Sequence, residues 1–437
     1  MSVSAREAAL KLLNDSEGKA FQSGFAVERI NAGFGLDEKD AALAVNIYLG
    51  CIQLRYRLDH YISCYSDIAP EKIDSCVRNI LRMAVYQFAF LDRIPAHAAV
   101  DEAVKLCRNH RPRAVSFVNA VLRHISAEKD RLPPASGTPA ERLSTEYSTE
   151  KWFAEYIIEN HGEAFAEAFL KSSNDVAPLS LRVNTLKTTV EEYKELLDKS
   201  GISYNEGNFE GILLIASGGV KDLPGYDEGL FYIQDPAAAA CAAITGIVPG
   251  QRVLDACASP GGKSFSAAIA MKNEGSILSC DINEKKTAKI SEGAKRLGAD
   301  IISLAVADAK KFDPALDSAF DTVIADVPCS GFGVLRKKPE IKYKSFDEVA
   351  SLPEIQRSII DNLSRYVRPG GVLLYSTCTV LREENEAVVE SFLSEHEDFK
   401  PSEFSCGGLS SKNGMYTFWP NVDGTDGFFA AKIYRIR

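Results

Sequence analysis

The chain has 437 residues, of which 46% are hydrophobic and 25% are charged, and this length suffices for two or three domains that each bury a core. Its uncharged apolar stretches are too short, or too interrupted by Gly and Pro, to span a membrane. The ten cysteines include no Cys-x-x-Cys pair, which argues against a structural zinc site or a disulfide framework. Composition therefore predicts a cytoplasmic protein with reduced thiols and no metal, and it excludes the secreted, membrane and disordered classes.

The net charge of −10 argues against a nucleic-acid partner, but this charge is unevenly distributed. Residues 1–131 carry 18 basic and 16 acidic side chains, a net charge of +2, so the remainder carries −12. Residues 78–124 contain eight basic residues and only three acidic ones. Because salt screens a charge beyond about 8–10 Å, a local basic surface can bind phosphates even on an acidic protein. A solvated helix face accounts for the same charges equally well.

The sequence before residue 236 divides into three regions. Residues 1–131 have apolar residues at helical spacing, as between Ala99 and Cys107, and predict an all-α bundle. Residues 132–144, which open with the segment LPPASGTP, predict a linker. Residues 145–235 predict a small α+β domain. Its expected elements are a helix at 151–170, a strand at 179–184, a helix at 190–199 and strands at 211–216 and 229–234.

Residues 236–437 alternate between apolar runs, polar or Gly-rich turns and helical segments. The runs lie at 252–256, 276–280, 301–307, 322–325 and 372–375. This alternation predicts an α/β domain in which a parallel sheet carries helices on both faces. In such a sheet ligands bind beyond the carboxyl ends of the strands, so the residues directly after each run are the candidates for chemistry.

The first of these strand ends reads DACASPGGKS, from Asp255 to Ser264. Its small residues and paired glycines let the backbone approach a ligand closely at the start of a helix. A phosphate-binding P-loop needs Gly at the position of Cys257, and a dinucleotide fingerprint needs Gly-x-Gly-x-x-Gly. Neither pattern is present, so the loop predicts a ligand without phosphates, such as S-adenosylmethionine.

Acidic residues follow the next two strands. Asp281 comes 20 residues after Gly261, the interval at which a carboxylate meets ribose hydroxyls in nucleotide-binding sheets. Asp308 follows the third strand, where a polar side chain can reach an adenine edge. Either acid alone is more simply a helix cap, but their order after a Gly-rich turn favours a ligand that contains a nucleoside.

Two cysteines follow the fourth and fifth strands: Cys329 in DVPCSGFG, three residues after Asp326, and Cys378 in STCT. A lone cysteine is usually a small buried hydrophobe, but two at neighbouring strand ends, one beside an acid, suit methyl transfer to a pyrimidine. Carbon 5 of a pyrimidine attacks a sulfonium methyl only after a thiolate has added to carbon 6, and an acid at ring N3 stabilises the charge that develops. A base must then remove the carbon-5 proton. Spacing alone leaves open which cysteine attacks.

These segments resemble the RNA cytosine-C5 methyltransferases of the NOL1/NOP2/Sun type. DACASPGGKS, DVPCSGFGVLRKKPE and YSTCT are similar to the family's motifs I, IV and VI, and LRVNT is similar to the segment ahead of its catalytic domain. SFVNAVLRHI is similar to the NusB-type RNA-binding helical domain. The resemblance implies an all-α NusB-like bundle at 1–131, a small α+β, RRM-like domain at 145–235 and a Rossmann-like class I methyltransferase domain at 236–437.

The resemblance also implies a role for each motif residue. Cys378 is the implied nucleophile, Cys329 the second thiol, needed for proton removal and product release, and Asp326 the acid that contacts the base. Ser259 and Thr379 stand where the family usually has Ala and Ser, and both positions remain small. The implied cofactor is S-adenosylmethionine. The residues that match its binding positions are Cys257, Ala258, Ser259, Pro260, Gly261, Gly262, Lys263, Asp281, Asp308 and Asp326.

The implied partner is small-subunit (16S) ribosomal RNA, bound by a monomer through phosphates more than base edges. The basic residues expected at the RNA are Arg108, Arg111, Arg113, Arg336, Lys337 and Lys338. Transfer RNA is an alternative substrate, because only the helical first domain favours ribosomal RNA. A non-catalytic assembly factor predicts a lost nucleophile, yet both cysteines and the acid are present. A metal-dependent hydrolase is disfavoured, since four of the six His lie in the helical domain.

Overall fold

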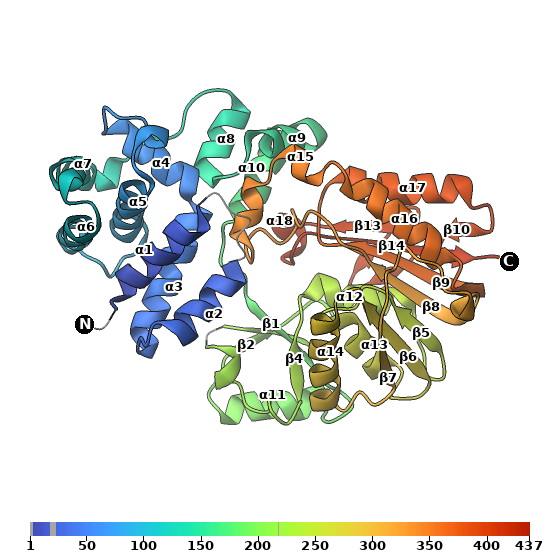
Figure 1. The fold of residues 1–437 in the computed structure, drawn as a ribbon. Helices are drawn as coiled ribbons and strands as arrows, with labels where there is room; N and C mark the ends of the chain where they lie inside the picture. Colours follow the sequence, from blue (N-terminus) through green and yellow to red (C-terminus); the bar gives the residue numbers. More distant parts are fainter. Residues whose placement is uncertain (1–2, 18–22, 217) are drawn as a thin grey trace. The chain divides into compact units, whose positions relative to one another are not determined.

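The computed structural model describes residues 3–17, 23–216 and 218–437. The chain forms two compact units, whose elements Figure 1 labels. The first, which we call the helical unit, comprises Met1–Asp175 and Leu335–Phe346, and the second, the sheet unit, comprises Val176–Val334 and Asp347–Arg437. The chain thus leaves the sheet unit after Val334, contributes a short segment to the helical unit and returns. No helix within the described residues is long and apolar enough to cross a membrane.

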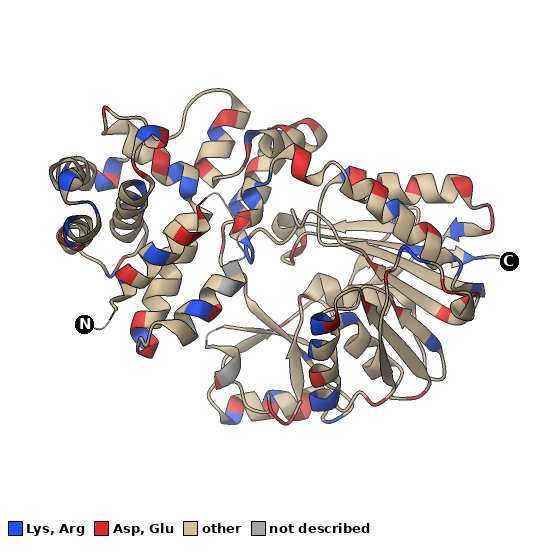
Figure 2. Cartoon of the chain, in the orientation of Figure 1, with Lys and Arg blue, Asp and Glu red and all other residues tan. Residues whose placement is uncertain are grey.

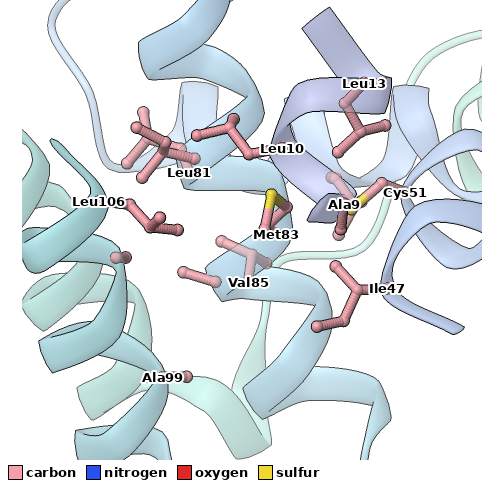
Figure 3. Packing of buried hydrophobic residues seen from close by; sticks show 14 of the residues in the cluster. Ala9, Leu10, Leu13, Ile47, Cys51, Leu81, Met83, Val85, Ala99 and Leu106 are labelled. Carbon is pink, nitrogen blue, oxygen red and sulfur yellow. The ribbon is translucent and has the colours of Figure 1, made fainter. Parts of the chain in front are cut away.

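The helical unit confirms the all-α prediction for the first part of the chain. Its helices are α1 (Ala5–Ser16), α2 (Ser23–Gly33), α3 (Glu38–Gln53), α4 (Arg55–Cys64), α5 (Ser75–Phe90), α6 (Ala96–His110), α7 (Val115–Ala127), α8 (Pro139–Tyr147), α9 (Lys151–His161) and α10 (Glu163–Ser172). Asp37 and Asp74 start α3 and α5 by accepting hydrogen bonds from backbone N–H groups of the first turn. The apolar faces of α1 to α7 meet in one core, where Leu10, Leu81 and Leu106 are buried between α1, α5 and α6 (Figure 3).

Two local predictions in this unit are wrong. The predicted linker 132–144 is too long, because α8 begins directly after Thr138. The Thr138 hydroxyl accepts from the Glu141 N–H, and the Glu141 carboxylate accepts from the Thr138 N–H, a reciprocal cap that starts a helix. The single helix predicted at 151–170 is two helices, α9 and α10. Gly162 separates them with a φ of 84° and an extended ψ of 159°, a backbone conformation that favours glycine and cannot continue a helix.

A buried lysine anchors the segment 335–346 within the helical unit. Lys342 is 1% exposed. Its ammonium donates to the backbone oxygens of Gln53 and Tyr147, each at 3.3 Å, and to the side-chain oxygen of Asn174. Burial lowers the pKa of Lys342 to about 7. The segment that continues the Cys329 loop is therefore held from the inside of the helical unit.

The sheet unit begins with a small antiparallel sheet of strand order β2-β3-β1-β4. Its elements are β1 (Leu179–Val183), α11 (Val190–Lys199), β2 (Tyr204–Glu206), β3 (Ile212–Ile215) and β4 (Phe231–Ile233). The α+β prediction is confirmed, although β2 was not predicted. Asn184 donates to the backbone oxygen of Leu297 at 2.8 Å, and the Tyr232 and Ser266 hydroxyls lie 2.8 Å apart, so the small sheet packs directly on the domain that follows.

The larger sheet has the strand order β10-β14-β9-β8-β5-β6-β7, with β13 beside β14. Its strands are β5 (Arg252–Asp255), β6 (Ser276–Asp281), β7 (Ile302–Val306), β8 (Phe320–Asp326), β9 (Val367–Thr377), β10 (Phe399–Pro401), β13 (Met415–Phe418) and β14 (Phe428–Arg435). The five predicted strands are parallel neighbours, as expected. The sheet as a whole is mixed, because β14 pairs antiparallel with β9, β10 and β13. The short connection between β13 and β14 permits only antiparallel pairing.

Helices cover both faces of the larger sheet, as predicted. They include α12 (Pro236–Thr245), α13 (Gly262–Ala270), α14 (Glu284–Leu297), α16 (Leu352–Ser364) and α17 (Glu386–Glu395). Successive strand residues point to opposite layers: Val323 and Leu373 pack with α16 and α17, whereas Ile324 and Leu374 pack with α12 and α13. Along α14, basic and acidic residues are interspersed (Figure 2), which is typical of a solvated helix face.

Candidate active site

The carboxyl ends of β5, β6, β8 and β9 meet at one edge of the larger sheet, because these strands are parallel and adjacent or nearly so. The register pairs Asp326, at the end of β8, with Ser376 of β9. It pairs Asp255, at the end of β5, with Ile324 and Ser279 on its two sides. The segments DACASPGGKS, DVPCSGFG and STCT therefore leave the sheet at the same edge. All the predicted catalytic and cofactor residues belong to the sheet unit.

The structure brings the two motif cysteines into contact. The sulfur atoms of Cys329 and Cys378 lie 3.1 Å apart, and the Cys378 N–H donates to the Cys329 sulfur at 3.2 Å. Neither thiol is in a disulfide, and both residues are half-buried. The hydrogen bond with Cys378, burial and the neighbouring charges of Cys378 and Glu384 raise the pKa of Cys329 well above its ordinary value, although the Cys378 N–H acts in the opposite direction. Two thiols that share a proton in this way ionise one at a time.

Glycines let the loops around the cysteines approach closely. The Gly333 N–H donates to the Cys378 oxygen at 2.9 Å, and the Gly427 N–H donates to the Gly333 oxygen at 2.8 Å. A Cβ at Gly333 would lie 1.9 Å from the Gly427 oxygen and 2.8 Å from the Cys378 oxygen. Only glycine fits there, so the loops after β8, β9 and β13 are fixed to one another through their backbones.

Asp326 is oriented by two side chains. Its Oδ2 lies 2.7 Å from the Lys263 ammonium, and its Oδ1 accepts from the Ser376 hydroxyl at 2.9 Å. Lys263 is buried, and its ammonium also lies 4.7 Å from the centre of the Phe428 ring. Burial alone would lower the pKa of Lys263, but the Asp326 charge outweighs it and the pKa is raised. Lys263, predicted as a cofactor residue, thus points its charge at the predicted catalytic acid.

A buried carboxylate that the sequence did not single out lies below the Gly-rich loop. Asp255 is 0% exposed, and its Oδ2 accepts from the Ser264 hydroxyl at 2.6 Å. Its Oδ1 is buried and accepts no hydrogen bond from the described residues. Burial raises the pKa of Asp255 to about 7. A buried oxygen of this kind fits a ligand that brings its own cationic donor.

The predicted cofactor loop, residues 257–262, is tightly folded between β5 and α13. The Ala258 N–H donates to the Cys280 oxygen at 2.8 Å, and the Gly261 N–H donates to the Ala258 oxygen at 2.6 Å. Gly261 has a φ of 110°, which favours glycine, and the Ser259–Pro260 bond is cis. Burial raises the pKa of Cys257, so its thiol stays protonated. The loop therefore offers backbone and small side chains to a ligand rather than charge.

The other predicted cofactor acids lie at the same edge. Asp281 ends β6, is 6% exposed and accepts from the Asn283 N–H at 2.9 Å. Asp308 lies two residues beyond β7, is half-buried and accepts from the Lys310 N–H at 3.0 Å. Next to Asp281, the side chain of Ile282 is 65% exposed. These residues present carboxylates and one apolar side chain at the strand ends.

The predicted RNA-binding residues all fall in the helical unit. Arg108 of α6, with Arg111 and Arg113 directly after it, is exposed, and Arg111 forms an ion pair with Asp74 at 3.1 Å. The second group lies in the segment that the helical unit takes from the loop after β8. That group consists of the half-buried Arg336 and the exposed Lys337 and Lys338. Figure 2 shows acidic residues interspersed with basic ones along the helices of this unit.

Two further site residues escaped sequence analysis. Glu384 and Gln356 are buried, and both contact the backbone beside Cys329. Glu384 stands in the charged run REENE, which is typical of an exposed helix, and no short motif marks Gln356. Among the residues that the structure describes, no group of three or more His, Cys, Asp or Glu side chains could hold a metal ion.

Comparison with known proteins identifies the family. The family model "16S rRNA methyltransferase RsmB/F" matches residues 243–434, the NusB family model matches 3–127, and a ferredoxin-like domain model of RsmF/B-like methyltransferases matches 150–221. The "Probable ribosomal RNA small subunit methyltransferase B" of Bacillus subtilis (strain 168) is 35% identical over 98% of both chains. The chain belongs to the RsmB/F methyltransferase family.

Other relatives agree with this assignment. The "Ribosomal RNA small subunit methyltransferase B" of Erwinia tasmaniensis is 31% identical over 91% of each chain. The crystal structure of PH0851 superposes with a TM-score of 0.81 at 26% identity and covers 99% of this chain and 98% of its own. The resemblance to RNA methyltransferases is thereby confirmed at the level of family, and so is the predicted order of a NusB-like bundle, a small α+β domain and a Rossmann-like methyltransferase domain.

Proposed function

We propose that the protein transfers a methyl group from S-adenosylmethionine to carbon 5 of a cytosine in 16S ribosomal RNA, through a transient bond between Cys378 and carbon 6 of the ring. The observation that carries this proposal is the 3.1 Å contact between the Cys329 and Cys378 sulfurs at the strand ends that also carry Asp326. Membership of the RsmB/F family supports the substrate class. Within this RNA, the proposed target is cytosine 967, the family's usual target. The proposed location of the protein in the cell is the cytoplasm.

The residues at the sheet edge fit S-adenosylmethionine. The buried Oδ1 of Asp255 suits the amino group of its methionine part, and Asp281 suits its ribose hydroxyls. Asp308 and the exposed Ile282, which follow neighbouring strands, would contact the adenine. The folded loop 257–262 allows close backbone approach without an anion cradle, in keeping with a ligand that has no phosphate. When bound there, S-adenosylmethionine supplies an activated methyl group.

The chain's own residues then divide the remaining work. Cys378, as a thiolate, bonds to carbon 6 and shifts the ring's electron pair toward carbon 5, which makes that carbon nucleophilic. Asp326, held by Lys263 and Ser376, passes a proton to ring N3 and so neutralises the negative charge that develops there, and the neighbouring Lys263 ammonium supplies that proton. Once Cys378 is bonded to carbon 6, Cys329 releases its own proton to solvent, and its thiolate accepts the carbon-5 proton after methylation. The bond from Cys378 to carbon 6 then breaks, the double bond re-forms and the thiolate is released.

The helical unit is the proposed positioning element for RNA. Arg108, Arg111 and Arg113 contribute exposed positive charge at and just beyond the end of α6, and Lys337 and Lys338 contribute it on the segment after the Cys329 loop. Such residues bind phosphates and fix register rather than read bases. The target cytosine must leave its stack to reach Cys378, which favours a loop or single-stranded region.

Two cysteine variants and one mapping experiment test the proposal. Cys378→Ala should abolish methylation while S-adenosylhomocysteine still binds, and Cys329→Ala should trap a covalent RNA adduct that migrates slowly on a denaturing gel. Bisulfite mapping of ribosomal and transfer RNA from cells without the protein should show one unprotected cytosine in 16S RNA. Normal turnover by Cys378→Ala would refute the assignment of Cys378 as the nucleophile. A methylation signal that is lost only in transfer RNA would show that transfer RNA, and not ribosomal RNA, is the substrate.

A further inference from the structure

Two free thiols lie in contact at the candidate active site. The sulfur atoms of Cys329 and Cys378 are 3.1 Å apart, and the Cys378 N–H also donates to the Cys329 sulfur at 3.2 Å. A disulfide bond is about 2.05 Å long, so the two sulfurs need to approach by only about 1 Å to form one. Both residues are half-buried, so a small oxidant can reach them from solvent.

Buried side chains hold the chain on both sides of Cys329. Glu384 is 1% exposed, and its Oε2 accepts from the Ser330 N–H at 2.9 Å. Gln356 is 0% exposed, and its amide donates to the Pro328 oxygen at 3.0 Å and to the Glu384 carboxylate at 2.8 Å. The residues directly before and after Cys329 are therefore both fixed, which limits how far its thiol can move away from Cys378.

Backbone hydrogen bonds join the loop of Cys378 to the loop of Cys329. The Val327 N–H donates to the Ser376 oxygen at 3.0 Å, and the Gly333 N–H donates to the Cys378 oxygen at 2.9 Å. These two bonds lie before and after Cys329 in the chain, so the loops stay together on both sides of the thiol pair. A reaction between the two sulfurs is therefore intramolecular and between groups already in position, which makes it far faster than a reaction with a dissolved thiol.

Other cysteines of the chain differ from this pair in exposure or in surroundings. Those buried in helices, and so shielded from an oxidant, are Cys51, Cys76, Cys107 and Cys241. Cys64, in the helical unit, is exposed, but among the described residues its sulfur contacts no second thiol. Cysteines that respond reversibly to oxidants are accessible and lie beside a second cysteine. The pair at the active site meets both conditions, and these five cysteines do not.

We propose that hydrogen peroxide converts Cys329 and Cys378 to a reversible disulfide, so that the active site is also a redox switch. The thiolate of one cysteine attacks the peroxide, the O–O bond breaks, and the sulfur becomes a sulfenic acid while hydroxide leaves and takes a proton to form water. The second cysteine loses its proton to solvent and attacks this sulfur, the S–O bond breaks, and a second hydroxide leaves as water while the S–S bond forms. Two electrons pass from the cysteines to the peroxide, and a dithiol returns them on reduction. The effect on methyl transfer rests on the proposed function, because the disulfide occupies the proposed nucleophile.

Peroxide treatment of the full-length protein tests the switch without RNA or a methyl donor. Hydrogen peroxide is added in steps at neutral pH, the remaining free thiols are blocked with N-ethylmaleimide, and every cysteine is mapped by mass spectrometry without reduction. We expect a linked pair of peptides that contains Cys329 and Cys378, and dithiothreitol should return both to free thiols. In parallel, methyl transfer should fall by about tenfold or more and recover on reduction, because the disulfide leaves no thiolate to attack carbon 6.

Two variants separate the thiol pair from ordinary cysteine oxidation. Cys64→Ser, at the exposed thiol of the helical unit, should leave the disulfide and its recovery unchanged. Cys329→Ser leaves Cys378 without a second thiol, so peroxide should carry Cys378 on to sulfinic acid, which dithiothreitol does not reverse.

The wild-type protein decides the inference even if Cys329→Ser does not fold. Oxidation of Cys64 shows that the peroxide was effective, and free Cys329 and Cys378 thiols at that concentration would overturn the inference. Sulfinic acid at either cysteine of the wild type, in place of the disulfide, would overturn it equally. A reversible disulfide in a protein that methylates no cytosine at carbon 5 would instead remove only the proposed function.

Discussion

The buried carboxylate of Asp255 predicts a pH-dependent affinity for the cofactor. Burial raises its pKa from 3.8 to about 7, and each pKa unit corresponds to 1.36 kcal/mol, so ionising this group inside the fold costs about 4 kcal/mol. A bound cationic amino group favours the ionised form. An α-amino group has a pKa near 7.7–8.0 and stays charged below pH 7. If protonated Asp255 excludes the ligand, affinity should rise about fifteenfold between pH 5.5 and pH 7.

Isothermal titration with S-adenosylhomocysteine over this pH range measures the effect. Asp255→Asn should bind more weakly at pH 7 and show no rise, because it has no proton to release. Asp300→Asn, a change at an exposed aspartate after α14, is the control and should retain the wild-type slope. A flat wild-type profile would refute the assignment of Asp255 to the amino group, as would a slope that survives in Asp255→Asn.

The Asp255 carboxyl group also predicts how the stability of the ligand-free protein depends on pH. Stability should fall as the pH rises, whereas affinity for the cofactor should increase. The folded chain keeps the Asp255 proton up to about pH 7, whereas the unfolded chain releases it near 3.8. The contribution of Asp255 to the free energy of unfolding is therefore fully present below pH 3.8. About 4 kcal/mol of it is lost as the pH rises to 7. In urea denaturation, the free energy of unfolding of Asp255→Asn should therefore exceed that of the wild type by more at pH 8 than at pH 5. An identical stability difference at both pH values would contradict the raised pKa.

Two further variants test other parts of the structure. Lys342 has a folded pKa of about 7, below its unfolded value of 10.5, so its contribution to stability should increase by about 1.4 kcal/mol per pH unit between pH 7.5 and 9.5. Urea denaturation of Lys342→Met should lack this increase. If stability rose equally with pH in the variant and the wild type, Lys342 would have to be exposed to solvent. Gly333→Ala forces a Cβ against the Gly427 and Cys378 oxygens and should slow methyl transfer about a hundredfold, because reacting groups displaced by about 1 Å lose that much. S-adenosylhomocysteine affinity should change little, and retention of full activity would show that the loops need no such contact.

Local signals in the amino-acid sequence determined much of this protein. The strand–turn–helix rhythm after residue 236 determined the parallel strands, because apolar runs of that length bounded by turns have few other stable arrangements. The segments that hold Asp326, Cys329 and Cys378 determined the candidate chemistry, since residue type and position after a strand are local properties. The sequence did not reveal that β14 runs antiparallel beside β9, because pairing between distant strands depends on their connections.

Tertiary structure alone decided the relations between distant residues. Glu384 lies in a charged run that is typical of solvent, yet the fold buries it against the loop of Cys329, 55 positions earlier. Lys263 belongs to the predicted cofactor loop, and only the packing of β5 beside β8 directs its charge to Asp326. Burial and the charge of a neighbour act through space, and they set the pKa of Asp255 and of Cys329. The sequence thus supplied the reactive groups, and the fold decided which of them share a proton.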